Sequence, residues 1–273
     1  MIKRGVLRCC VSLTILTLLT GCGLFNDDEP RIDRSSGPLS DERYQWTASP
    51  GIDLLTGPAV PIRAYIESWL DAQTMGSLDY AYPGFDRTVA ARPTDGRLDM
   101  LTGNLRPDED GSPSETVRVG NNRFRIQSIS RSGQKVTAIL CHYRYRLALE
   151  EENGKFVSVA HNAVHDDGIE AMLVMLNVPV NEQSNLPPQA GPAPAPVVDV
   201  FGDWKITGFL NGFRSPDPEF DNIWPTFDED TAKCVAEAPD PPERRAFLIQ
   251  GEHPRSDFPN SPPSPGWPEG GSE

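Results

Sequence analysis

The sequence predicts an α+β domain in which one helix is followed by antiparallel strands. Two changes in periodicity support this prediction. Apolar residues between positions 61 and 76 recur at the three- and four-residue spacing of a helix, whereas beyond position 118 apolar and polar residues alternate as they do in strands. Turn signals such as Asn153-Gly154 separate the later segments. Residues 46–250 have the length of one domain.

The chain begins with a segment typical of secretory leaders. Lys3, Arg4 and Arg8 precede an apolar run that extends from Cys9 to Leu19. This run is about half the roughly 20 residues that a membrane-spanning helix needs. We therefore expect a cleaved leader rather than a permanent transmembrane anchor.

The leader ends in Leu19-Thr20-Gly21-Cys22, which resembles the lipobox of bacterial lipoproteins. In that family the cysteine thiol receives a diacylglycerol, and the signal peptidase cuts before the cysteine. The resemblance implies a signal peptide at residues 1–21, and acyl chains on Cys22 that hold the protein on membrane lipid. We expect the mature protein on the extracytoplasmic face of the cell membrane.

Three further segments are predicted to lie outside the packed core. Residues 22–45 are polar and read as a flexible tether after the lipidated cysteine, and residues 251–273 read as a disordered tail rich in Pro, Ser and Gly. A Pro-rich insert at 186–196 reads as a surface loop of the single domain 46–250. Together with the lipobox and a preference for Arg over Lys, the segment Ser36–Trp46 resembles actinobacterial, mycobacterial-type lipoproteins.

The first predicted element of the domain is a helix that starts at Pro61 and ends at Gly76. Its apolar face is formed by Ile62, Tyr65, Ile66, Trp69 and Leu70. The charged residues of the opposite side are expected to face solvent, and they are Arg63, Glu67 and Asp71.

Alternating segments after Arg118 predict long strands. Phe124 and Ile126 belong to a first strand, which a Ser132-Gly133 turn joins to a second. The core face of the second strand is predicted to carry Ile139, Cys141, Tyr143, Tyr145 and Leu147. Its other face, expected to be partly wet, carries His142, Arg144 and Arg146.

The remaining strands are predicted from Phe156, over Ile169–Val178 and over Val197–Phe213. The second of these is apolar on both faces and also fits a buried helix, although the turn before it favours a strand. The predicted order is one helix and then a meander of antiparallel strands, the last of which contains Gly202-Asp-Trp-Lys-Ile-Thr207. This order resembles the NTF2-like (cystatin-like, SnoaL-type) superfamily. The resemblance implies a curved sheet around the helix, with a conical pocket. A mainly antiparallel β lipoprotein domain is the alternative fold.

The net charge disfavours one class of partner, and the cysteine content predicts a disulfide. The formal net charge is −14 and becomes more negative when the leader is removed, which disfavours nucleic acid as a partner. Once the leader is cleaved and Cys22 is acylated, Cys141 and Cys234 remain, and we expect them to form a disulfide in an oxidising compartment.

The densest group of polar residues contains His161, His165 and Asp166. Four residues of a strand span about 13 Å, which is too far for two ligands of one metal ion, so no metal site is expected. Proton transfer by these residues is the catalytic alternative that the NTF2-like resemblance implies. The candidate pocket for an apolar ligand is instead aromatic, and it consists of Tyr65, Trp69, Tyr143, Tyr145, Trp204 and Phe209.

Three functional hypotheses follow. The leading one is a non-catalytic lipoprotein without a cofactor that binds an envelope protein or a lipid-like, apolar ligand. The second is a small enzyme that uses a His–Asp pair, and the third is a structural component of the cell envelope.

Overall fold

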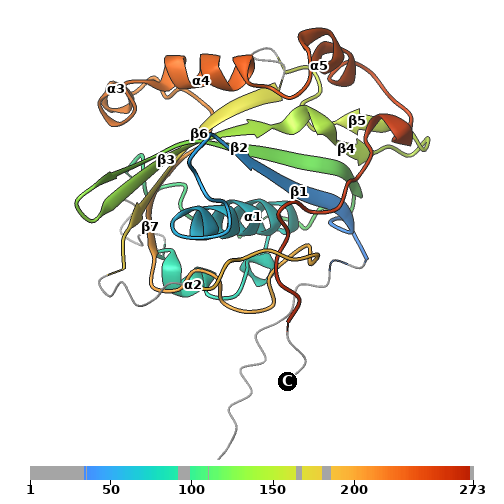
Figure 1. The fold of residues 1–273 in the computed structure, drawn as a ribbon. Coiled ribbons are helices and arrows are strands. Elements are labelled where there is room, and N and C mark those ends of the chain that lie inside the picture. The colour runs from blue at the N-terminus through green and yellow to red at the C-terminus, as the bar shows by residue number, and fades with distance from the viewer. Residues whose placement is uncertain are drawn as a thin grey trace, which may run out of the picture.

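The computed structural model describes residues 34, 36–91, 99–109, 111–163, 168–179 and 186–270. Within these residues seven strands form one open, mainly antiparallel sheet with helices on both faces (Figure 1), so the predicted α+β class is confirmed. The strands are β1 Asp41–Ala48, β2 Arg118–Ser132, β3 Lys135–Tyr143, β4 Leu147–Glu150, β5 Phe156–Ser158, β6 Ile169–Asn177 and β7 Lys205–Leu210.

The central strands form a meander. β2 pairs antiparallel with β3 through the predicted hairpin, β3 pairs with β6, and β6 pairs with β7. The predicted long second strand is interrupted by a 3-10 turn at Arg144–Arg146, after which β4 continues along β2 and pairs with β5. Arg123 of β2 is aligned with both Tyr143 of β3 and Gln45 of β1. β1 therefore lies parallel to β2 on the edge opposite β3.

Helix α1, Ala59–Met75, lies in the concave face of the sheet and confirms the predicted helix. Gly76 ends it with φ of 62°, a left-handed conformation that glycine adopts at little cost. The short helix α2, Phe85–Thr88, lies beyond α1, on the side away from the sheet. This layout agrees with the NTF2-like arrangement of a curved sheet around a helix.

A second layer of helices, which the sequence pattern did not predict, covers the other face of the sheet. The layer comprises α3 Glu219–Ile223, α4 Phe227–Ala236 and α5 Pro242–Leu248. Because α4 packs on β3 and β6, both faces of these strands are buried. This explains why the segment from Ile169 is apolar on both sides, and it confirms a strand there.

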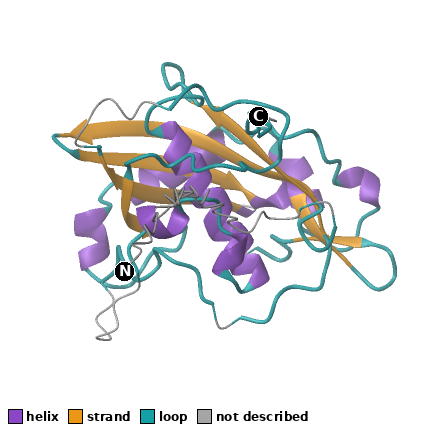
Figure 2. Cartoon of the chain, turned by 90° about the horizontal axis from the view of Figure 1, so that it is seen from below, coloured by secondary structure: helices purple, strands orange, loops and turns teal. Residues whose placement is uncertain are grey.

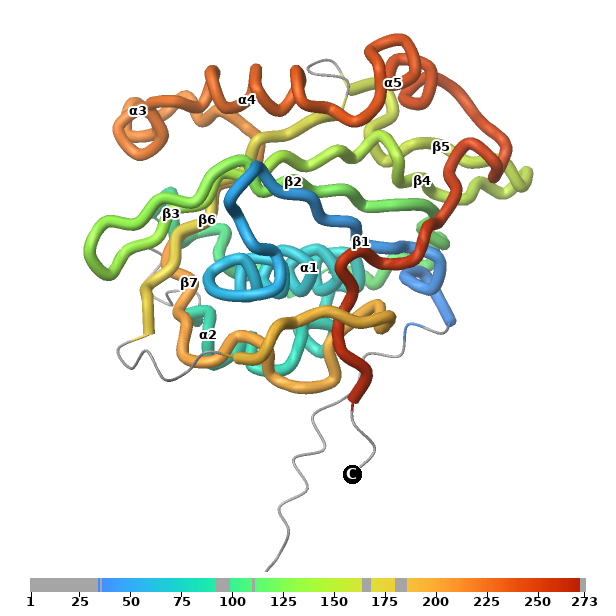
Figure 3. Tube along the Cα trace, in the orientation of Figure 1, coloured from blue at the N-terminus to red at the C-terminus, as the bar shows by residue number. Residues whose placement is uncertain are grey.

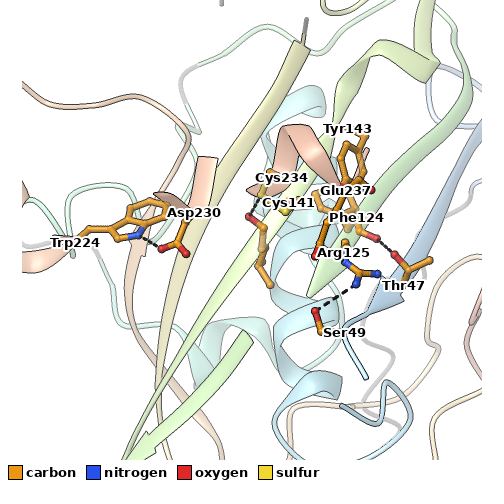
Figure 4. The surroundings of a disulfide bond; sticks show 11 residues. Thr47, Ser49, Phe124, Arg125, Cys141, Tyr143, Trp224, Asp230, Cys234 and Glu237 are labelled. Atoms are coloured by element: carbon orange, nitrogen blue, oxygen red, sulfur yellow. Dashed lines mark hydrogen bonds and ion pairs between the residues drawn. A yellow bond between two sulfur atoms is a disulfide. The ribbon is translucent and has the colours of Figure 1, made fainter. Parts of the chain in front are cut away.

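The predicted disulfide joins Cys141 of β3 to Cys234 of α4 with a Cα–Cα distance of 5.3 Å. Figure 4 shows it at the point where α4 crosses the sheet. Both cysteines are fully buried, so the bond ties the outer helical layer to the sheet from within the core.

Within the described residues, the parts 36–45 and 251–270 of the two predicted extensions belong to the folded domain, so for these parts the predicted tether and disordered tail were wrong. β1 begins at Asp41, inside the proposed tether, because Tyr44 and Trp46 on one of its faces are buried in the core. The tail runs along β1, where the Trp46 amide donates to the carbonyl of Ser264 at 2.6 Å (Figure 3). Phe258 and Trp267 bury their rings in the two halves of the core. Two aromatic side chains therefore hold a segment that its Pro, Ser and Gly content had marked as disordered.

The Pro-rich insert is a loop as predicted, and it pairs with this tail. Ala193 and Trp267 exchange two backbone hydrogen bonds of 3.1 and 2.9 Å. Figure 2, viewed from below, shows loop segments crossing in front of the sheet. The insert and the tail thus close the side of α1 that the sheet leaves open.

Candidate functional site

The six residues of the predicted aromatic pocket do not line one cavity. Tyr65, Trp69 and Phe209 pack together beneath the sheet, with ring centroids 5.5 Å apart for Tyr65–Phe209 and 5.4 Å for Trp69–Phe209. Trp204 is partly buried against the same hydrophobic core. Tyr143 and Tyr145 lie on the opposite face of the sheet, in the core under α4 and α5. The residues were grouped wrongly because both faces of the sheet are core, so inward-facing side chains belong to two separate layers.

The charged side of α1 is buried rather than solvated, which corrects another prediction. Glu67 accepts hydrogen bonds from Trp46 Nε1 at 2.7 Å, from the Tyr82 hydroxyl at 2.8 Å and from Trp267 Nε1 at 2.8 Å. Burial raises the pKa of Glu67 above its ordinary value. Three side chains from β1, the segment before α2 and the tail therefore converge on one helix carboxylate.

The neighbouring charges of α1 have the same structural role. Arg63 donates to the carbonyls of Leu54 and Pro265 at 2.9 Å, and its guanidinium lies 4.3 Å from the centroid of the Trp267 ring. Asp71 is paired with Arg34 and accepts a hydrogen bond from the hydroxyl of Tyr44 at 2.8 Å. Burial raises the pKa of Asp71 to about 7. Arg63 also donates to the carbonyl of Gln189 at 3.2 Å, so Arg63 and Asp71 hold the insert, the tail and β1 to the helix.

A second network of hydrogen-bonded polar side chains lies where β2, β3 and β6 run side by side. The carboxylate of Glu42 accepts from Arg118 Nε and from Asn122 Nδ2, both at 2.7 Å. A carboxylate can only accept, so the amide nitrogen of Asn122 must face Glu42 and its carbonyl oxygen must face His142, 2.6 Å from Nε2. The proton of neutral His142 therefore lies on Nε2, and Nδ1 is left as an acceptor.

His142 was predicted on a partly wet face of the sheet but is only 4 % exposed. Its ring stacks on Phe124 with centroids 4.2 Å apart, and Nδ1 lies 3.7 Å from Oε2 of Glu170, which is paired with Arg144. Burial lowers the pKa of His142 below its ordinary value. Burial alone would raise the pKa of Glu170, but the charge and the hydrogen bond of Arg144 act to lower it. At neutral pH the site holds a neutral imidazole beside a carboxylate.

This pair opens on a cavity of about 230 Å³ between α1 and the sheet, here named the His142 cavity. Apolar groups from three elements line it beside the polar ones. Its lining residues include Trp69, Gln73, Arg118, Asn122, His142, Arg144, Glu170, Met172, Asn211 and Phe213.

A larger cavity of about 840 Å³ lies on the other face, between the start of β6 and the first turns of α4, and is here named the α4 cavity. Its wall is largely apolar and includes Val159, Ala160, Ala163, Ile169, Ala171, Phe213, Phe227 and Ala232. The charged residues of the wall occur in ion pairs, Arg144 with Glu170 and Arg214 with Asp228. The buried hydroxyl oxygen of Thr231, which also lines the cavity, has no hydrogen-bond partner.

The other sequence-predicted site residues are only partly placed by the structure. His161 lines the α4 cavity, whereas His165 and Asp166 lie outside the described residues, so the proposed proton-transfer pair stays a prediction. Cys22 and the Leu19-Thr20-Gly21 motif also lie outside them. Among the described residues no cluster of His, Cys, Asp and Glu is arranged to hold a metal ion, and no helix is long and apolar enough to cross a membrane.

Comparison with protein-family models, curated proteins and solved structures gives no match. What the protein binds is therefore inferred from its own geometry. The polar residues that meet at the His142 cavity, Asn122, His142 and Glu170, come from three strands. Only the strand pairing brings them together, and no local motif in the sequence marks them.

Proposed function

We propose that the protein is a non-catalytic lipoprotein of the cell envelope that holds an apolar or amphipathic ligand in the α4 cavity. The volume of this cavity supports the proposal, because about 840 Å³ lies within the range of roughly 300–1,000 Å³ typical of small-molecule sites. Its wall combines apolar side chains with charges that are already neutralised in pairs. Such a wall suits an uncharged hydrocarbon body better than an ionic ligand.

The rim of the cavity supports the same conclusion. Phe213 is 68 % exposed and lies at the mouth of the α4 cavity. A large aromatic ring that is exposed at a cavity mouth gains buried area when an apolar ligand lies against it. The free hydroxyl of Thr231 offers a hydrogen bond to one polar group of that ligand.

The lipid anchor is the part of the proposal that rests on the sequence alone. The motif at Cys22 follows a basic segment and a short apolar run, in the order that lipoprotein export requires. The substitution Cys22→Ala should leave the precursor unprocessed and release the folded domain from the membrane fraction. Tight membrane association of the Cys22→Ala chain after a high-salt wash would contradict the anchor.

Ligand binding can be tested with a matched pair of helix variants. Ala232 lines the α4 cavity, whereas Ala236 lies one turn further along α4, is also exposed and does not line it. Ala232→Trp should block uptake of a fluorescent long-chain fatty acid, because the indole fills space that the acyl chain needs, and Ala236→Trp should not. Equal uptake by the two variants, or none by the unmodified protein, would favour a structural envelope component instead.

A further inference from the structure

The nitrogen Nδ1 of His142 needs a hydrogen-bond donor that the described part of the chain does not provide. It is buried and has no hydrogen-bond partner. Asn122 fixes one proton on Nε2, so Nδ1 of the neutral imidazole presents a lone pair. Oε2 of Glu170, which lies 3.7 Å from Nδ1, also only accepts. Two acceptors therefore face each other across a gap that opens into the His142 cavity.

The charges around the gap decide which donor suits it. An ammonium group could donate to both acceptors, but Arg118 and Arg144 line the same cavity, so the cavity has no excess of negative charge to hold a cation. The carboxylates already have guanidinium partners, Glu42 with Arg118 and Glu170 with Arg144. An uncharged group with two adjacent donors is left as the best match. Two neighbouring hydroxyl groups meet this requirement, since each can donate one proton and can also accept from Arg144.

The remaining wall and the size of the cavity indicate the rest of the ligand. Trp69, Met172 and Phe213 provide apolar surfaces for C–H groups beside the polar end of the cavity. The volume of about 230 Å³ corresponds to roughly eight water molecules at about 30 Å³ each, too little for a lipid and enough for a small polyol.

We propose that the His142 cavity binds a small, uncharged polyhydroxylated molecule through a vicinal diol. One hydroxyl donates to Nδ1 of His142, and the neighbouring hydroxyl donates to Glu170. Glu42 and Asn122 act as positioning residues, because they hold the imidazole in the tautomer that can accept. The His142 cavity adjoins the α4 cavity, and Arg144, Val159, Glu170 and Phe213 line both of them. They differ in their other residues, since Asn122 and His142 line only the first and Phe227 and Ala232 line only the second.

The test is a titration of the full chain, labelled with ¹⁵N-histidine and followed by NMR. The sequence contains four histidines, so the His142 signals can be assigned by comparison with a His142→Phe chain. The probes are myo-inositol and glucose, with cyclohexanol as a ring of similar size that has one hydroxyl and no diol. We expect a saturable shift of the Nδ1 resonance with at least one polyol and none with cyclohexanol.

Two substitutions sharpen the result. In Glu170→Gln the new amide can itself donate to Nδ1, so polyol binding should weaken about tenfold or more. Glu237→Gln removes a carboxylate that pairs with Arg125 on the surface, and it should leave binding unchanged. Ala232→Trp should block fatty-acid uptake without affecting polyol binding, which separates a failure here from a failure of the proposed function.

Three outcomes would overturn the proposal. The first is no saturable shift with either polyol, and the second is an equal shift with cyclohexanol. The third is a wild-type spectrum in which Nδ1 already carries a proton, because that nitrogen could then not accept a hydroxyl. The titrations of the unmodified chain are decisive by themselves if Glu170→Gln fails to fold.

Discussion

Replacing Trp267 by alanine tests whether the tail is part of the folded core. The ring is 1 % exposed, packs edge-on against Tyr82 at 6.0 Å and lies under the guanidinium of Arg63. A buried Trp→Ala change typically costs about 3–5 kcal/mol through lost transfer energy and the cavity that it leaves. Glu67 also loses one of its three donors, which adds a desolvation cost of about 1–3 kcal/mol if no water replaces it. We therefore expect the free energy of unfolding to fall by at least about 3 kcal/mol.

The assay is equilibrium unfolding in urea, followed by far-UV circular dichroism, with two comparison variants. Trp267→Phe keeps most of the buried ring but not the indole N–H, so it isolates the loss of the Glu67 bond, at about 1–3 kcal/mol. Phe247→Ala removes an aromatic ring that is 47 % exposed on α5 and should cost about 1 kcal/mol or less. A cost of under about 1 kcal/mol for Trp267→Ala would refute the packed tail.

Two further predictions concern the disulfide and the buried acid of α1. Reduction of Cys141–Cys234, which closes a loop with a sequence separation of 93, should lower the free energy of unfolding by about 4–5 kcal/mol in the chain-entropy model. Urea curves with and without dithiothreitol measure this, and coincident curves would contradict it. Because burial raises the pKa of Asp71 from 3.8 to about 7, the folded state keeps a proton that the unfolded state loses over this range. The free energy of unfolding should therefore fall as pH rises from about 4 to about 7, and it should fall less steeply in Asp71→Asn. Equal slopes for the two chains would contradict the raised pKa of Asp71.

The elements with strong local patterns could be predicted from the sequence. The apolar spacing from Ile62 and the glycine at 76 placed α1 within a few residues. The hairpin after Ser132 and the strand from Ile169 were likewise evident from turn residues and apolar runs. The disulfide followed from the elimination of the other cysteines, and the structure joins the two that remained.

The errors share one physical cause, which is burial by distant segments. Arg63, Glu67 and Asp71 read as a solvated helix face because their partners, among them Trp267 and Pro265, lie about 200 residues away in the tail. The tail itself read as disordered because composition alone does not show that a few aromatic rings find places in a core. A chain whose sheet is covered on both faces also lacks the simple alternation that separates core from surface.

The candidate sites depended on the same distant contacts. His142 was assigned to a wet face by alternation along one strand, although α1 covers that face and Asn122 and Glu170 flank the ring. The α4 cavity could not be expected at all, since α4 was not predicted. A sequence pattern shows which way a side chain points from its strand, but not what lies opposite it.

The most direct test of a ligand in the α4 cavity is native mass spectrometry of the chain extracted gently from its own membranes. Three samples would be compared, namely the unmodified protein, Ala232→Trp and Ala236→Trp. We expect a retained small molecule in the unmodified protein and in Ala236→Trp, and a bare polypeptide mass for Ala232→Trp. A bare mass for all three chains, or the same bound mass in all three, would contradict the α4 cavity as the binding site.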